Sequence, residues 1–144
     1  MDPVLQSVLL SVANVAAGAL FGGMLFLTAF FAPQAFKRLP DGVADRFVRE
    51  LFPSYYLIAL ALAGIAAVAC APVRTAEAIV MALVAAGFLF ARYYLMPKTL
   101  IAHDERARGT PGAAEAFADL HKRSAFLNMV QFVATLVVLV RLVD

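Results

Sequence analysis

The sequence has no tryptophan, a single cysteine and few charged residues: of its 144 residues only 15% are charged, while 63% are hydrophobic. An ordinary soluble domain is about 25% charged and about 45–50% apolar. A soluble chain of this length could not cover so much apolar surface. We therefore expect the excess to face lipid, which excludes soluble enzymes and proteins that bind nucleic acid. The single cysteine, Cys70, excludes an intrachain disulfide and a metal site held by paired cysteines.

Four long segments contain almost no charged residue. They predict membrane-spanning helices over residues 4–31, 54–71, 76–94 and 124–142, because a helix needs about 20 mostly apolar residues to cross a bilayer. Glu77 and Arg92 fall in the terminal turns of the third helix, where long side chains can extend to the headgroups. We therefore expect an all-α fold, a polytopic membrane four-helix bundle in which residues 1–144 form a single domain. The first segment is much longer than the apolar part of a signal peptide, and no Lys or Arg precedes Lys37, so we expect it to be retained.

Basic residues are concentrated in two of the three connections. Ten of the 12 Lys and Arg residues lie in or beside the first and third connections, and the other two are Arg74 and Arg141. The positive-inside rule predicts that these two connections are cytoplasmic and that both termini are outside. Tyrosine favours the headgroup layer, and all four tyrosines fall at the expected inner ends of the second and third helices: Tyr55, Tyr56, Tyr93 and Tyr94.

Both cytoplasmic connections contain an amphipathic pattern. Asp41 is expected to cap one helix, and Thr110-Pro111 is typical of the start of another. We expect two short amphipathic helices that lie along the membrane surface and feed into the next span, and a mobile, solvated segment over residues 103–109 that includes His103. The expected apolar faces contain Val43, Phe47 and Leu51 in the first helix and Phe117 and Leu120 in the second, and the expected ion pairs of the first are Asp45/Arg49 and Arg46/Glu50.

The two halves of the chain follow the same order. The first and third spans both end near a proline, Pro33 or Pro97, and each is followed by an amphipathic helix and a further span. This order favours two helical hairpins of the same orientation, duplicated in parallel. The alternative is that any two membrane hairpins share these features.

Several short segments match a family pattern when they are taken together. They are Gly22, Phe26 and Phe31-Ala-Pro-Gln-Ala-Phe36, then Leu51-Phe-Pro-Ser-Tyr-Tyr56, Pro97, and Leu120-His121-x-x-Ser124-x-x-x-Asn128. In these segments, from about Asn14 to Val140, the chain resembles the transmembrane-protein-205-like family, whose bacterial members are described as a domain of unknown function. The resemblance implies a four-span integral protein, here of the bacterial inner membrane. It brings no catalytic or ligand-binding residues with it.

A polar stripe follows the last span at helical spacing. It is formed by His121, Ser124, Asn128, Gln131 and Thr135. The first span has a stripe of its own, formed by Ser7, Ser11, Asn14, Gly18 and Gly22. Because an amide in hydrocarbon must find a partner, we expect both stripes to face the interior of the bundle. Two interpretations stay open, helix–helix packing contacts or a polar pathway and ligand pocket.

More than one interpretation stays open for His121 and for Arg92. His121 is expected at the inner interface, either as a packing contact to the amphipathic helices or as a group that handles a proton or a ligand. Arg92 would extend to the headgroups, pair with a carboxylate such as Asp45 or Glu50, or face His121 and the tyrosines as an anion site for lipid headgroups or phosphates. Both histidines are expected in the cytoplasm, so we expect no transmembrane haem pair, and Cys70 and Met81 are expected as packing residues.

Three functions of different classes remain. No sequence motif indicates a hydrolase, kinase or redox enzyme, and no catalytic residue, metal or cofactor is predicted. The first hypothesis is a binding or structural subunit of a membrane complex, whose partners include lipids and further copies or other proteins. The second is a small carrier of a small or amphiphilic solute that uses the stripes of the first and last spans. The third is a membrane enzyme that acts at the cytoplasmic interface.

Overall fold

The computed structural model describes the whole chain as helices joined by short turns. The elements are α1 (Pro3–Leu25), the π-helical segment η1 (Phe26–Phe31), α2 (Ala32–Arg38), α3 (Val43–Cys70), α4 (Thr75–Phe90), the π-helical segment η2 (Ala91–Leu95), α5 (Met96–Ala107) and α6 (Ala113–Val143). They join into four continuous helical segments, Pro3–Arg38, Val43–Cys70, Thr75–Ala107 and Ala113–Val143, each long and apolar enough to cross a membrane. The predicted all-α four-helix bundle is confirmed.

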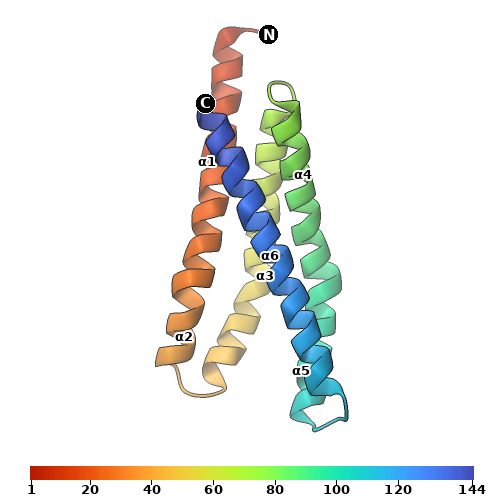
Figure 1. Cartoon of the computed structure of the whole chain (residues 1–144). Coiled ribbons are helices and arrows are strands. Elements are labelled where there is room, and N and C mark those ends of the chain that lie inside the picture. The colour runs from red at the N-terminus through yellow and green to blue at the C-terminus, as the bar shows by residue number, and fades with distance from the viewer.

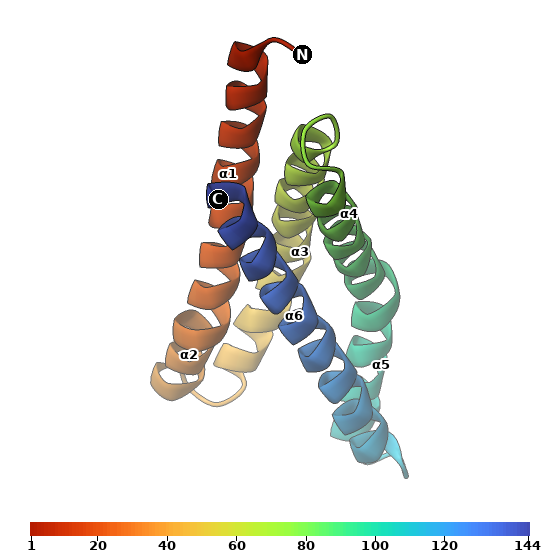
Figure 2. The same cartoon turned by 45° about the horizontal axis from the view of Figure 1, so that its top comes forward.

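The four segments alternate in direction. The α3–α4 turn and both chain termini lie toward one end of the bundle, which we call the terminal end (Figure 1). The α2–α3 and α5–α6 connections lie at the opposite end, which we call the connection end. There the α2–α3 pair and the α5–α6 pair diverge, as both views show (Figure 2). The two connections with most of the basic residues therefore lie at the same end of the molecule.

Small residues hold the helices close together. The core between α1 and α3 is rich in alanine, and larger side chains such as Met81, Phe88 and Val138 fill the space beside α4 and α6. Alanine at helix interfaces lets backbones approach, which is how helices associate in lipid where no hydrophobic effect drives them together. The buried alanines of α1 and α3 are Ala13, Ala16, Ala17, Ala59, Ala63, Ala66 and Ala69.

The amphipathic segments enter the spans as predicted, but they differ from the prediction in one respect. They are not separate surface helices but the first turns of α3 and α6, which run without interruption into the spans. Proline removes only one N–H donor, and α3 continues through Pro53. Gly42 and Gly112, with φ of 82° and 78°, take the N-cap positions expected for Asp41 and Thr110, because only glycine adopts this conformation freely. The two predicted ion pairs of α3 are confirmed, with Asp45–Arg49 at 3.2 Å and Arg46–Glu50 at 3.1 Å.

The two halves of the chain share unusual backbone features. The N–H of Ala32 donates to the carbonyl of Leu27, and the N–H of Met96 donates to that of Ala91, a bond five residues back in each case. Each of these turns comes directly before a proline, Pro33 or Pro97. A proline ring clashes with the carbonyl four residues back, and the wider π turn relieves that clash. With a positive-φ glycine before both α3 and α6, each half has the same order of elements.

Candidate functional site

The most deeply buried part of the α6 stripe is a packing contact with α4. Gln131 and Thr135 are buried, and the side-chain amide Nε2 of Gln131 donates to the carbonyl oxygen of Val84 over 3.0 Å. The Thr135 hydroxyl donates to the backbone carbonyl of Gln131 over 2.7 Å. Both polar side chains find their partners in the protein, without a ligand.

The two predicted stripes do not meet. Gln131 faces α4 rather than α1, and where α1 and α6 come together Phe21 stacks on Phe132 with ring centroids 4.6 Å apart. Ser7 and Ser11 are exposed, and the Ser11 hydroxyl donates back to the carbonyl of Ser7. Gln131 and Thr135 of the α6 stripe therefore face the interior as expected, whereas Ser7 and Ser11 of the α1 stripe do not.

The other members of these stripes make few polar contacts. Asn14 is partly buried, and its side-chain carbonyl oxygen is buried without a hydrogen-bond partner. Ser124 and Asn128 are partly buried and their side chains form no hydrogen bond within the chain. His121 is exposed, and its ring lies parallel to that of Phe117 with centroids 6.2 Å apart.

Arg92 takes a position that the sequence did not predict. Its guanidinium donates to the backbone carbonyl of Pro53, so it joins η2 to α3. It forms no ion pair with Asp45 or Glu50, and its guanidinium carbon lies 5.4 Å from the centroid of the Tyr93 ring. The predicted cluster of Arg92 with His121 is not formed.

The four tyrosines divide into two pairs with different surroundings. Tyr55 and Tyr56 are partly buried, and both rings contact Phe88 of α4, with the Tyr55 hydroxyl buried and unpartnered. Tyr93 and Tyr94 are exposed. The Tyr94 hydroxyl accepts a hydrogen bond from Lys98 over 2.8 Å. Only this second pair resembles an interfacial tyrosine with an apolar ring and a solvated hydroxyl.

His103 is the centre of a polar network that sequence reasoning missed. Its Nε2 lies 3.0 Å from a carboxylate oxygen of Asp45, and its Nδ1 lies 3.3 Å from a guanidinium nitrogen of Arg49. Arginine can only donate, so Nδ1 accepts and Nε2 carries the proton that Asp45 accepts. Asp104 lies 3.9 Å from Arg49, and the His103 ring meets the face of Phe117 edge-on. The network joins α3, α5 and α6 at the connection end.

This network was missed because residues 103–109 were expected as a mobile loop, whereas α5 continues to Ala107. A signal was present in the sequence. His103 follows Pro97 and Thr99 in a stretch without glycine, which allows a helix to continue. The interpretation of His103 as a solvated loop residue is therefore wrong.

An ion pair also joins two helices at the terminal end. Arg141 of α6 donates to Glu77 of α4 over 2.6 Å. The Glu77 side chain is only 4% exposed, so it does not extend to the headgroups as expected. Burial of the carboxylate is compensated by the arginine. Cys70 and Met81 lie in the core at this side of the bundle, as the packing interpretation predicted.

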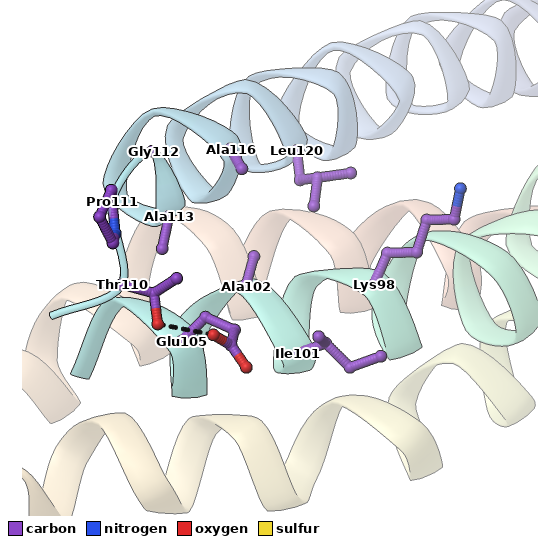
Figure 3. A pocket seen from close by; sticks show the side chains of 10 residues that line it. All are labelled: Lys98, Ile101, Ala102, Glu105, Thr110, Pro111, Gly112, Ala113, Ala116 and Leu120. Carbon is purple, nitrogen blue, oxygen red and sulfur yellow. Dashed lines mark hydrogen bonds between the residues drawn. The ribbon is translucent and has the colours of Figure 1, made fainter. Parts of the chain in front are cut away.

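Two surface grooves lie at the connection end. One, of about 390 Å³, runs between α5 and α6, with Lys98 toward one end and the hydrogen-bonded pair Glu105 and Thr110 at the other (Figure 3). Its middle is apolar. The other groove, of about 540 Å³, lies between α3 and the start of α5 and contains two arginines. Its lining residues are Arg46, Arg49, Glu50, Pro53, Met96 and Leu100.

Comparison with known proteins identifies a family without an assigned activity. No curated protein and no solved structure matches the chain. One family model matches residues 15–108, which extend from α1 to the end of α5 and include His103, its polar partners Asp45 and Arg49, and Arg46 of the α3–α5 groove. The chain belongs to the family described as Domain of unknown function (DUF4149).

Proposed function

We propose that this protein is a binding or structural subunit of a membrane complex, and that it holds a partner at its connection end. The observation that carries the proposal is that α5 and α6 continue as helices beyond the apolar part of the bundle and are joined there to α3 by the His103 network. We call the projecting part, residues 43–50, 98–107 and 113–123, the platform.

Helix lengths support a platform outside the bilayer. The stretch of α6 between Arg123 and Arg141 is uncharged and is about 27 Å long, close to the roughly 30 Å of a hydrocarbon core. From Ala113 to Arg123 the same helix continues for about 15 Å, and α5 continues for about 14 Å from Lys98 to Ala107. Charged side chains are dense in these projecting turns, as expected for a surface in water.

The platform has a defined shape because its side chains pair across helices. Asp45 and Arg49 of α3 both contact His103 of α5, and Phe117 of α6 makes an edge-to-face contact with the ring. A surface that is ordered before binding costs less entropy to bind than a mobile loop would. The interior gives less support to a carrier, because Gln131 and Thr135 are satisfied within the bundle.

The proposal includes a membrane and an orientation for the protein. The segments that resemble the transmembrane-protein-205-like family favour a bacterial inner-membrane protein of that kind. The basic residues beside the two connections favour an orientation in which the platform is cytoplasmic and both termini are outside. A cytoplasmic platform could reach soluble proteins as well as other membrane subunits.

Photo-crosslinking in intact membranes tests the proposal. A photoreactive residue replaces Ile101, which is 63% exposed on α5 of the platform, or Val68, which is 75% exposed within the α3 span, as a matched apolar control. We expect a protein adduct of one discrete mass from position 101 and lipid adducts alone from position 68. Lipid adducts at both positions, or the same protein adducts at both, would overturn the proposal.

A further inference from the structure

The groove between α3 and α5 has two arginines in its lining, Arg46 and Arg49. We propose that it binds the phosphate of an anionic phospholipid, with the headgroup at the arginines and the acyl chains on the apolar surface next to it. The proposal does not depend on the platform having a protein partner. It rests on three features: the cations that surround the groove, its level in the membrane, and the apolar surface beside it.

Three arginines surround the groove. Arg46 and Arg49 line it, and Arg92 lies at its membrane-facing end, since its guanidinium donates to the carbonyl of Pro53, a lining residue. Arg49 is held in place by Asp45 and His103, and its Nε is buried without an acceptor within the chain. Arg92 has no acidic partner at all. Guanidinium groups bind phosphate oxygens through paired, charge-assisted hydrogen bonds.

The level of the groove matches that of lipid phosphates. Glu50 is the last charged residue of α3 before a stretch without charges that extends to Val73. The groove contains residues from both sides of this boundary, with Arg46 and Glu50 before it and Pro53 after it. Basic hollows between spanning helices at this level are typical sites for anionic headgroups.

The surface beside the groove is suited to acyl chains. Leu57 lies one turn beyond Pro53 on α3, and Tyr93 lies nearly one turn before Met96 on the other wall. Both side chains are exposed, so an apolar surface continues from the groove toward the bilayer centre. A phospholipid has this same order of a phosphate followed by acyl chains, whereas a soluble phosphate would leave the apolar surface unused.

Native mass spectrometry of the intact protein tests the proposal. The purified chain is released from nanodiscs that contain phosphatidylglycerol and phosphatidylcholine in equal amounts. The mass of the protein with its retained lipid then identifies the lipid. We expect one phosphatidylglycerol to be retained preferentially. Arg46→Gln should weaken its retention about fivefold, the loss of one cation near an anionic headgroup. Glu50→Gln should strengthen it, because the competing carboxylate is removed.

Arg123→Gln is the matched control. Arg46 and Arg123 are both highly exposed, at 78% and 68%, and each pairs with a carboxylate one turn away on its own helix, but Arg123 lies on α6 outside the groove. Its variant should retain phosphatidylglycerol as the unmodified protein does. Because Arg46 is so exposed, loss of folding would not explain a weaker retention.

Several outcomes would overturn the proposal. They are equal retention of the two lipids, an equal effect of Arg46→Gln and Arg123→Gln, and weaker retention in Glu50→Gln. A final arm adds millimolar inorganic phosphate to the lipid-loaded protein. Displacement of the lipid by phosphate would assign the groove to a soluble phosphate compound instead. A failed lipid test would leave the crosslinking result at position 101 unaffected, so the two proposals fail separately.

Discussion

The side-chain amide of Gln131 crosses from α6 to the backbone of α4, where it donates to the carbonyl oxygen of Val84 over 3.0 Å. The contact depends on a glycine. A Cβ at Gly87 would lie 2.6 Å from Nε2 of Gln131, closer than real Cβ atoms come to other heavy atoms, and Gly87 is on the same face of α4 as Val84. Because Gly87 has no side chain, the Gln131 amide can occupy the space beside α4. We call Gly87 and Gln131 together the packing unit.

Gly87→Ala should destabilise the bundle. The added methyl group must displace the Gln131 amide, which loses its hydrogen bond in a buried position, at a cost of about 1–3 kcal/mol in the free energy of unfolding. Unfolding in mixed micelles with increasing denaturing detergent measures the change. Gly64→Ala is the control, because a Cβ there meets nothing within 4 Å, and its helix propensity should leave stability equal or higher. Equal losses in both variants would contradict the packing unit.

The ion pair at the terminal end predicts an asymmetry. Glu77 is 4% exposed and Arg141 is 59% exposed, so removal of one partner leaves a buried charge in one case and a solvated charge in the other. Arg141→Gln leaves a buried carboxylate without its cation and should cost about 3–5 kcal/mol. Glu77→Gln leaves an arginine that can turn to water or headgroups, and should cost clearly less. The same detergent titration ranks the two variants, and the reverse order would show that Glu77 is not buried in the bundle.

The orientation of the bundle can be read from cysteine accessibility. Asp41→Cys and Thr110→Cys place a thiol at the two connections, and Asp2→Cys places one near the N-terminus. Native Cys70 is buried and should give little background. In sealed cells a membrane-impermeant maleimide should label only the variant at position 2, and inverted vesicles should give the opposite result. Labelling of all three from one side would rule out four spans.

The number and order of helices could be predicted from the sequence because a helix that crosses lipid must be almost free of charged residues. Stretches without charges set the spans, and the basic residues set the common end of two connections. Helix ends were less predictable. Asp41 and Thr110 are good capping residues, but the turn requires a positive φ, and the neighbouring glycines meet that requirement at lower cost.

The polar contacts were harder to predict because they depend on how the helices rotate and extend. Spacing placed Gln131 and Thr135 correctly on one buried face, but it could not tell that this face meets α4 and not α1. For the same reason the sequence favoured His121 over His103 as a candidate site residue, and the structure shows the opposite. His121 belongs to the stripe yet is exposed, whereas His103 was taken for a loop residue and bridges two helices.

His103→Ala should loosen the platform without unfolding the bundle. The ring accepts from Arg49 and donates to Asp45, and such bonds to charged groups are worth about 1.5–3 kcal/mol, so amides of α5 should exchange with deuterium roughly 10–100 times faster. Hydrogen exchange followed by mass spectrometry of residues 96–107 measures this. His121→Ala, which removes an exposed ring from the same end, should leave α5 unchanged. Equal exchange in the two variants would show that His103 does not hold α5, and the order of the platform would then be due to α5–α6 packing instead.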